Sequence, residues 1–342
     1  KVVGVDPAAT SPRWMQQRLT LAGMRPLSLV VDVANYVMLD MGQPLHTFDA
    51  ASLTAPVVVR RANAGEVLET LDGQKRELFA EDLVIADSEG GHGARPVALA
   101  GVMGGASTEV GQDTSDIVIE AATFDSVSVA RSSRRHKLSS EASKRFERGV
   151  DPQLPLVAAQ RAAELLAEYG GGTIDAARTH VKAAQLEAQT VDLPMDFAAR
   201  VVGIDYTREQ IVDSLQMIGC TVESDGGEGS RERFKVTVPT WRPDLTIREA
   251  LVEEIARLVG YDAIPSVLPS APGGHGLTRA QRARRAASIA LAEAGAVEVL
   301  SFPFTSDKSI QALRFAPDSA EVQAVRLLNP LADDEPLMRT LS

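Results

Sequence analysis

The chain has 342 residues, a length that predicts two or three domains rather than a single core. Hydrophobic residues make up 44% and charged residues 24%, as in ordinary globular proteins, and no apolar run approaches the length of a membrane span. A formal net charge of −11 argues against a surface devoted to nucleic acid, and a single cysteine excludes an intramolecular disulfide and cysteine-rich zinc sites.

Residues 1–182 predict one mixed α/β unit. Ser11 to Ala22 is expected to be a helix that Ser11 caps, with Pro12 in its first turn. The Asp72-Gly73 pair predicts a tight hairpin turn. Short strands are expected at Val57–Arg61, Val67–Leu71, Leu78, Leu83–Ala86 and Ile117–Ala121. One long helix is expected at Pro155–Tyr169, where three glycines end it.

The segment from Asn35 to Asp49 has the pattern of a pocket wall. Apolar residues surround Asn35 and His46, and the backbone between them is expected to bend at Gly42 and Pro44. A lone histidine is more often structural than functional. Beside an asparagine and a Gly-Gln-Pro turn, contact between His46 and a ligand or a water becomes a working hypothesis.

Two further features of this unit admit both a structural and a functional interpretation. The glycines of the Ala98–Ser107 segment can form a tight bend, or a floor without side chains where a ligand approaches the backbone. The segment does not match a Walker loop, because no Gly-Lys-Ser/Thr follows. Glu120 lies within an apolar strand, where it either points to solvent or accepts a hydrogen bond from a ligand hydroxyl or amine.

Positive charge is concentrated between Arg131 and Arg148. This stretch holds seven Lys or Arg against two Glu, with His136 in addition. One interpretation is a solvated helix face. The other is a local basic patch that contacts phosphates, in a protein that touches RNA at one place only.

Residues 190–265 predict a second, small unit. Thr207 caps a helix that Gly219 ends, two strands follow at Cys220–Glu223 and Phe234–Val238, and a helix covers Ile247–Val259. Helix, two strands and helix suggest a winged-helix-like module. We expect Cys220 to be buried as an apolar side chain.

Three acids of the second unit, Asp244, Glu253 and Glu254, are hard oxygen ligands of the kind that magnesium prefers. Adjacent helix residues diverge by about 100°, so Glu253 and Glu254 cannot both face one site without a second partner surface. Without further context, acids on a surface helix are the better explanation of these residues.

The remaining sequence predicts a linker and the beginning of a third unit. The linker covers Pro265–His275, a helix covers Thr278–Ala294, and strands are expected at Val297–Pro303 and Val325–Pro330. The chain starts without Met and stops just after an apolar stretch, which suggests a piece of a longer polypeptide. No leader pattern opens it, so neither secretion nor membrane insertion is indicated, and a cytoplasmic location fits.

Taken together, five stretches resemble the β subunit of bacterial phenylalanyl-tRNA synthetase, in the order of that family. The resemblance implies an α+β multidomain fold with an editing domain at 1–182, a small winged-helix-like magnesium-linked domain at 190–265 and the truncated start of a class II synthetase-like domain at 276–342. The stretches that carry it are Val30–Asp49, Ala98–Gly105, Glu141–Pro152, Trp241–Pro265 and Leu327–Thr340.

The resemblance implies hydrolysis of tyrosine misattached to tRNA(Phe). An apolar synthetic pocket rejects an added hydroxyl by only ~10²-fold, so a second pocket that reads the hydroxyl is needed. Motif matching assigns that hydroxyl to Glu120, and places Asn35 and His46 near the scissile ester, where they position water or ribose. The implied pocket walls are Ala100, Gly101, Gly104 and Ala142. Catalysis would rest on an oriented water, since no nucleophile set is apparent.

The resemblance also implies partners and cofactors. Asp244, Glu253 and Glu254 would bind Mg²⁺ shared with an α subunit, in a heterotetramer of two α and two β chains. The complex would charge tRNA(Phe) with phenylalanine at an ATP site on α, so this chain by itself is at most an aminoacyl-ester hydrolase. Neither a membrane nor DNA is an expected partner.

Three positions depart from the family pattern. Ala34 and Ser140 each stand where the family usually has a Thr. Ala250 stands where the family has a fourth acidic metal ligand. Ala34 keeps open the alternative of a scaffold and tRNA-docking subunit that has lost editing. A DNA-binding winged helix is a third interpretation, which the net charge and the acids of the second unit oppose.

Overall fold

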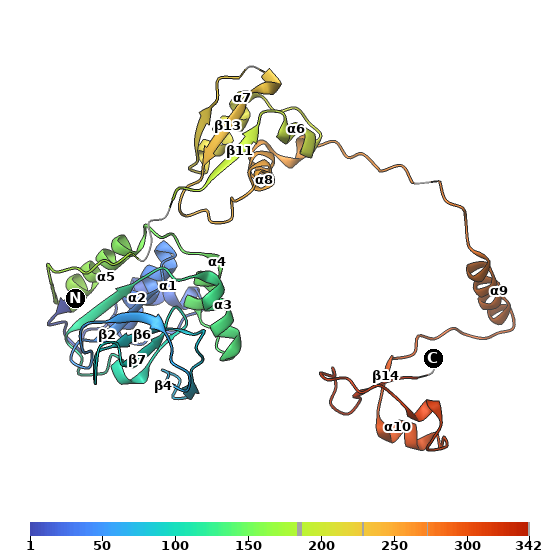
Figure 1. The fold of residues 1–342 in the computed structure, drawn as a ribbon, viewed down its shortest axis with the longest axis horizontal. Helices are drawn as coiled ribbons and strands as arrows, with labels where there is room; N and C mark the ends of the chain where they lie inside the picture. Colours follow the sequence, from blue (N-terminus) through green and yellow to red (C-terminus); the bar gives the residue numbers. More distant parts are fainter. Residues whose placement is uncertain (183–186, 228, 272, 341–342) are drawn as a thin grey trace. The chain divides into compact units, whose positions relative to one another are not determined.

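The computed structural model describes residues 1–182, 187–227, 229–271 and 273–340. The chain divides into two compact units, Lys1–Ser266 and Val267–Ser342 (Figure 1). Within the first unit, separate hydrophobic cores form among residues before Ile174 and among residues from Val191 to Val259. No helix in the described ranges combines the length and the apolarity that crossing a membrane requires.

The part of the chain before residue 182, called the N-terminal lobe below, mixes helices with short strands. In chain order its elements are β1 (Val2–Val3), α1 (Arg13–Leu21), α2 (Leu29–Met41), β2 (Leu45–Asp49), β3 (Val58–Arg61), β4 (Val67–Glu69), β5 (Lys75–Glu77), β6 (Leu83–Asp87), β7 (Arg95–Leu99), β8 (Met103–Gly104), η1 (Ala106–Thr108), β9 (Ile117–Ala121), α3 (Ser126–Arg135), α4 (Glu141–Arg148), α5 (Pro155–Gly170) and β10 (Thr173–Ile174).

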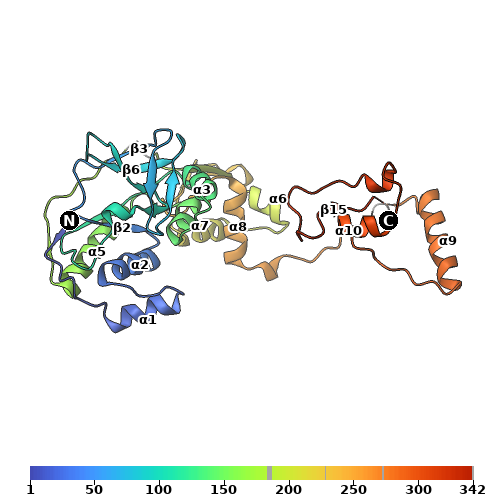
Figure 2. The same cartoon turned by 90° about the horizontal axis from the view of Figure 1, so that it is seen from below.

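Two antiparallel sheets form the middle layers of the N-terminal lobe. Their strand orders are β10-β1-β9-β2 and β3-β6-β7-β8. Ile117 of β9 packs with α1, α2 and α5, whereas Val118 faces the other way and packs against the second sheet. The far side of the second sheet is covered by α3 and α4, where Leu99 packs with Phe146. Figure 2 shows α1 and α2 on one side of β2, and β3 and β6 on the other.

Helix α2 and strand β2 together make up the segment predicted to be a pocket wall. Ser28 caps the helix, and Gly42 ends it in the left-handed conformation at φ 77°. The predicted bend at Gly42 and Pro44 is therefore a helix-to-strand corner. The helix itself was not predicted.

The other local predictions for this lobe are largely confirmed. The Asp72-Gly73 turn joins β4 to β5, and Ile117–Ala121 is β9. The prediction that Ser11 caps α1 is wrong. Its hydroxyl instead donates to the buried carboxylate of Asp32 at 2.6 Å, and the backbone N–H of Leu27 donates to the other oxygen of that carboxylate at 2.8 Å.

The part of the chain from residue 190 to 263, the middle lobe, has one small sheet. Its strands follow the order β11-β13-β12, and its elements are β11 (Thr190–Pro194), α6 (Phe197–Val202), α7 (Arg208–Met217), β12 (Thr221–Ser224), η2 (Gly229–Arg231), β13 (Arg233–Thr237), α8 (Arg248–Val259) and η3 (Tyr261–Ala263). Thr207 caps α7 as predicted, and Cys220 is buried in the core as predicted.

The unit Val267–Ser342 has little internal packing. It contains α9 (Arg279–Glu293), β14 (Phe304–Thr305), α10 (Asp307–Ala312), η4 (Ala320–Val322) and β15 (Leu337–Met338). The helix predicted at Thr278–Ala294 is confirmed. The strands predicted at Val297–Pro303 and Val325–Pro330 are wrong, since β14 pairs with β15 instead and Leu300 is fully exposed. Without a neighbouring strand to cover it, an apolar run of this kind has no reason to extend as a strand.

Candidate functional site

His46 and Glu120 lie directly opposite each other on neighbouring antiparallel strands, β2 and β9. Directly opposed residues have Cβ atoms about 5 Å apart and point to the same face of the sheet. That face is the one carrying Phe48 and Val118, which packs against the second sheet. The structure thus joins two residues that the sequence separates widely, and both point between the sheets.

Glu120 is largely enclosed by protein. None of the described residues donates to its carboxylate, although the residue keeps some contact with solvent. Burial disfavours the charged form and raises the pKa of Glu120 to about 7. Of the two interpretations of this acid, the inward-facing one is therefore the correct one.

His46 is held in a tight apolar setting. Its ring meets the ring of Phe48 edge-on, with centroids 4.6 Å apart, and its Nε2 atom is buried without a hydrogen-bond partner among the described residues. Burial lowers the pKa of His46 to about 4, so the imidazole is neutral at physiological pH. A neutral ring can accept or donate one hydrogen bond but brings no positive charge to the site.

The glycines of the Ala98–Gly105 loop are explained by close packing. A Cβ added to Gly104 would lie 2.3 Å from Cε1 of His46, so only glycine lets the ring sit there. A Cβ on Gly101 would lie 3.0 Å from side-chain atoms of Phe124, Val129 and Phe146. Gly104 therefore packs against the ring of His46, and Gly101 packs against side chains of α3 and α4.

The two predicted alanines lie in the same neighbourhood. Ala100 is buried in a cluster with Phe48, and Ala142, from the first turn of α4, packs partly buried in the cluster that contains Val102. The hydroxyl of Ser140 caps α4 and also donates to the carbonyl of Val102 at 2.7 Å. The start of α4 is thus fixed to the glycine loop.

No hydrogen bond in the described ranges joins the side chain of Asn35 to this group. It lies on α2, whose core residues pack against the opposite face of the first sheet from His46. Within the described ranges its side chain makes no hydrogen bond. Ala34, the neighbouring departure, is buried in the same helix.

Gln43 is a residue of this site that the sequence did not single out. Its amide nitrogen donates to the carbonyl of Ala122 at 2.8 Å and to that of Pro44 at 2.9 Å, which ties the start of β2 to the end of β9. The residue is fully buried and its Oε1 atom has no partner in the described structure. A glutamine placed between two turn-forming residues, Gly42 and Pro44, was the available signal.

The three acids of the middle lobe do not gather into a metal site. Arg242 pairs with Asp244 at 2.6 Å and with Glu254 at 3.0 Å, and these bonds lower the pKa of both acids, that of Glu254 to about 2. The exposed Glu253 accepts from the hydroxyl of Tyr261 instead. No group of three or more His, Cys, Asp or Glu in the described ranges is placed to hold a metal ion. As arranged here, this chain's donor set does not fit Mg²⁺ without ligands from outside.

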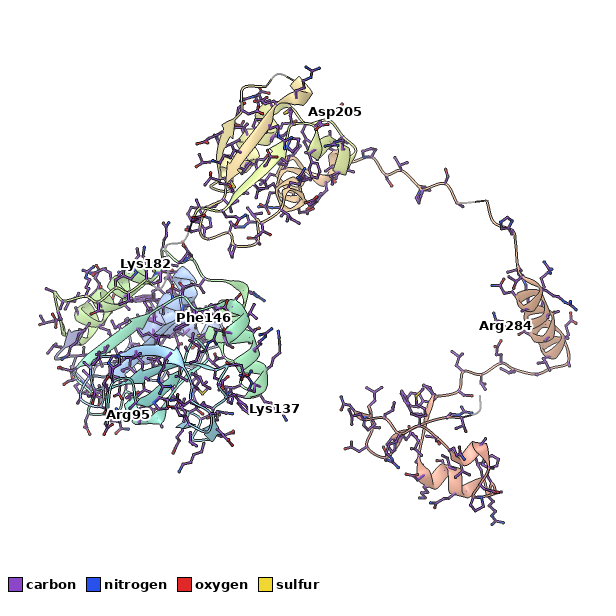
Figure 3. The ribbon with its side chains drawn as sticks, in the orientation of Figure 1. Arg95, Lys137, Phe146, Lys182, Asp205 and Arg284 are labelled. Carbon is purple, nitrogen blue, oxygen red and sulfur yellow. The ribbon has the colours of Figure 1, made fainter. Side chains whose placement is uncertain are left out.

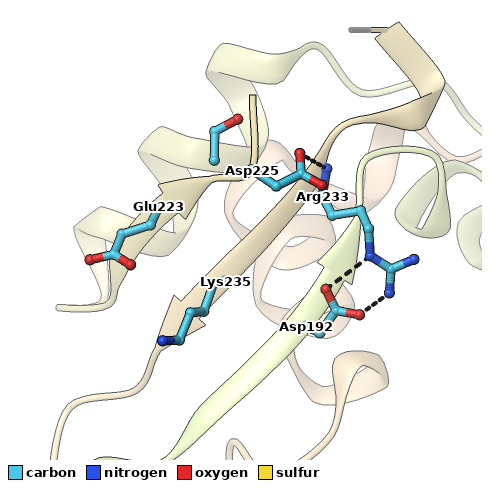
Figure 4. Close-up of a pocket in the computed structure, with 6 residues that line it drawn as sticks. Asp192, Glu223, Asp225, Arg233 and Lys235 are labelled. Atoms are coloured by element: carbon cyan, nitrogen blue, oxygen red, sulfur yellow. Dashed lines mark hydrogen bonds and ion pairs between the residues drawn. The ribbon is translucent and has the colours of Figure 1, made fainter. Parts of the chain in front are cut away.

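A shallow groove on the sheet of the middle lobe is a different feature (Figure 4). Arg233 pairs with Asp192, and Glu223 lies opposite Lys235 across β12 and β13. Because opposite charges already neighbour each other there, and because no predicted site residue lines it, the groove is not a candidate active site. Its lining residues are Asp192, Glu223, Ser224, Asp225, Arg233 and Lys235.

The basic stretch from Arg131 to Arg148 forms α3, α4 and the turn between them. One part of its charge is structural: the fully buried carboxylate of Asp82 receives hydrogen bonds from Ser132, Arg135 and His136. These bonds, together with one from the backbone of Phe79, outweigh burial and lower the pKa of Asp82. They fasten α3 to the loop before β6.

Comparison with known proteins matches the chain to three domain families in succession. Residues 1–171 match the B3/4 domain, residues 191–261 the tRNA synthetase B5 domain, and residues 264–341 the phenylalanyl tRNA synthetase beta chain CLM domain. The first match covers the whole N-terminal lobe except its last residues.

Curated relatives agree with these matches. The chain is 50% identical over 339 residues to the phenylalanine–tRNA ligase beta subunit of Thermobifida fusca, covering 99% of this chain and 40% of that protein. It is 51% identical over 337 residues to the corresponding subunit of Bifidobacterium longum, covering 98% and 38%. The chain thus spans about two fifths of the length of these relatives.

Among solved structures, an N-terminal fragment of the phenylalanyl-tRNA synthetase β subunit from Pyrococcus horikoshii is similar at 15% identity and a TM-score of 0.33, covering 76% of this chain and 69% of that one. The domain order and the curated relatives identify the family. The chain belongs to the family of phenylalanine–tRNA ligase β subunits, of which it contains the B3/4, B5 and CLM domains.

Proposed function

We propose that the N-terminal lobe hydrolyses tyrosine that has been misattached to tRNA(Phe), within the β subunit of a phenylalanine–tRNA ligase. The observation that carries the proposal is the unpartnered acid Glu120, enclosed between two sheets directly across from His46. A buried acid without a partner costs stability, so its presence is explained when a ligand supplies the missing hydrogen bond. The phenol hydroxyl of tyrosine is such a ligand, and phenylalanine lacks it.

In this proposal the remaining residues orient the substrate. Ala100, Gly101, Gly104 and Ala142 bring no polar side chain, so they are proposed as the apolar walls around the substrate. His46, neutral and with a free ring nitrogen, is suited to hold a water or the terminal ribose near the ester. No described serine, cysteine or acid bonds to the His46 ring, which favours an oriented water over a protein nucleophile. Asn35 is the second residue proposed to lie toward the ester, as the family resemblance implies.

The proposal for the whole protein follows from its relatives. The β chain would pair with an α subunit, in a heterotetramer of two α and two β chains, and the complex would use ATP on α to charge tRNA(Phe) in the cytoplasm. The domain boundaries at 1–182, 190–265 and 276–342 belong to this proposal. A Mg²⁺ ion held by Asp244, Glu253 and Glu254 would need ligands from the α subunit and the release of Arg242.

A deacylation assay tests the editing proposal. Tyrosyl-tRNA(Phe) and phenylalanyl-tRNA(Phe) are incubated with the reconstituted α/β complex, and free amino acid is measured over time. A hydrogen bond to a charged group contributes about 1.5–3 kcal/mol, so Glu120→Ala should lower kcat/KM for the tyrosyl substrate by about 10- to 150-fold. Hydrolysis of the phenylalanyl substrate should stay at its low level.

Glu77→Ala is the matched control, because Glu77 is exposed on β5 and forms no ion pair with any described residue. It should leave both rates unchanged. Absence of tyrosyl-tRNA hydrolysis by the intact complex would refute the editing proposal and favour the alternative of a scaffold and tRNA-docking subunit.

A further inference from the structure

The outer face of the α3–α4 hairpin carries positive charge that the fold does not use. Among the basic residues of this hairpin, Arg135 pairs with Asp82, and Lys144 and Arg145 both pair with Glu141. The charge of Arg131, after hydrogen bonds from Ser128 and the charge of Arg61, helps to lower the pKa of Asp125, so Arg131 also acts within the fold.

Arg134, Lys137 and Arg148 make no ion pair or hydrogen bond with any side chain in the described ranges, and all three are exposed. Figure 3 shows Lys137 at the outer edge of the N-terminal lobe, with Phe146 of the same hairpin in its interior. The chain as a whole carries a net charge of −11, whereas these three cations of one helical hairpin have no ion pair within the described ranges. We call these three residues the hairpin cations.

The inner face of the same hairpin contacts the loop of the candidate site. Val129 of α3 and Phe146 of α4 would both lie 3.0 Å from a Cβ on Gly101, and Ser140 bonds the carbonyl of Val102. The hairpin is therefore a wall of the site neighbourhood on its inner side and a basic surface on its outer side. A helix is about 10 Å across, which sets the spacing between the two.

We propose that the hairpin cations bind the phosphodiester backbone of an RNA whose aminoacylated end enters between the two sheets. This inference rests on the editing proposal and adds the surface that docks the polymer. Backbone contacts of this kind position a nucleic acid without reading its sequence. They suit a site that must accept the same tRNA whichever amino acid it carries.

Salt-dependent binding tests the surface separately from any hydrolysis. The probe is fluorescently labelled, uncharged tRNA(Phe), titrated with the full 342-residue chain between about 50 and 200 mM salt. Each cation that neutralises a phosphate contributes about 0.7–0.9 to the slope of log K against log salt. The triple variant Arg134→Gln/Lys137→Gln/Arg148→Gln should lower that slope by about 2 and weaken binding at the lower salt by at least about tenfold.

The matched control removes the same charge from another exposed helix. Arg279, Arg284 and Arg285 on α9 likewise have no ion pair among the described residues, and their conversion to Gln should leave the slope unchanged. An unchanged slope in the hairpin variant, or an equal fall in both variants, would overturn the proposal. The first result would point to an acidic protein surface as the partner of the hairpin, and the second to net charge alone.

A pair of substrates separates this inference from the editing proposal. Tyrosine esterified to adenosine offers the ester without the RNA backbone, whereas tyrosyl-tRNA(Phe) offers both. In the α/β complex the triple variant should lower kcat/KM for tyrosyl-tRNA(Phe) by at least about tenfold and leave tyrosyl-adenosine unaffected. An equal loss on both substrates would overturn the docking role. If the unmodified complex hydrolysed neither substrate, the editing proposal would be wrong. The salt dependence of tRNA binding would still show whether the hairpin cations contact the RNA backbone.

Discussion

Replacing Glu120 by Gln keeps the size of the side chain and removes its ionisation. Burial raises the pKa of Glu120 from 4.5 to about 7 in the folded protein. Below pH 4.5 the folded and unfolded chains both hold this proton, and stability is unaffected. Between pH 4.5 and 7 the unfolded chain releases it while the folded chain retains it, so the carboxyl lowers the free energy of unfolding as pH rises.

The size of the effect follows from the pKa difference. At about 1.4 kcal/mol for each pKa unit, Glu120 lowers the free energy of unfolding by at most about 3.5 kcal/mol above pH 7. Glu120→Gln should recover most of that energy at pH 8 and almost none at pH 4. For a lobe of this size the recovery corresponds to a rise in Tm of about 6–12 °C.

Fluorescence provides the assay, since the chain has two tryptophans and Trp14 lies in the N-terminal lobe. In a Trp241→Phe background, Trp14 reports urea unfolding of that lobe alone, measured from pH 4 to pH 8. The exposed control Glu77→Gln should follow the parent protein at every pH. Parallel curves for Glu120→Gln and its parent would show that Glu120 is not desolvated, and would refute the reasoning.

Three further substitutions probe the same lobe. Gly104→Ala should abolish tyrosyl-tRNA hydrolysis and cost about 1–3 kcal/mol, because the new methyl group collides with His46, while Gly111→Ala, which meets only an ordinary contact, should leave both quantities unchanged. Asp82→Asn should lower the free energy of unfolding by about 1–3 kcal/mol in urea titrations, since it weakens the acceptor that Ser132, Arg135 and His136 share; a loss below about 1 kcal/mol would contradict this. Gln43→Ala should cost about 1–3 kcal/mol and reduce kcat more than it raises KM, since it loosens the junction of the two site strands; a pure KM effect would instead indicate direct contact with substrate.

Capping and turn residues correctly predicted the helix ends and turns that depend on a few neighbouring residues. Thr207 caps α7 because its hydroxyl reaches the backbone three residues on, and Asp72-Gly73 turns because glycine accepts the positive φ that the hairpin needs. Ser11 shows the limit of such signals. Its hydroxyl could cap the helix, but it donates instead to Asp32, a buried acid 21 residues away, because each oxygen of a buried carboxylate is stabilised by a hydrogen bond.

Helix α2 escaped prediction for a different reason. It is buried on most of its surface, so its apolar residues do not repeat every three or four positions as they do in a helix with one solvent face. The orientation of Glu120 likewise depends on distant structure. Because side chains alternate along a strand, Glu120 and Ile119 point to opposite faces of the first sheet. The face that carries Glu120 is interior only because the second sheet packs against it.

The bond between Gln43 and Ala122 joins residues 79 positions apart, and everything from β3 to β8 lies between them in the chain. The second sheet is thus a long insertion between β2 and β9, two strands that lie side by side in the first sheet. During synthesis, His46 emerges long before its partner strand, and the site can form only when this long loop closes. The Ala98–Gly105 loop lies within the same insertion, so the closure that pairs β2 with β9 must also bring Gly104 against His46.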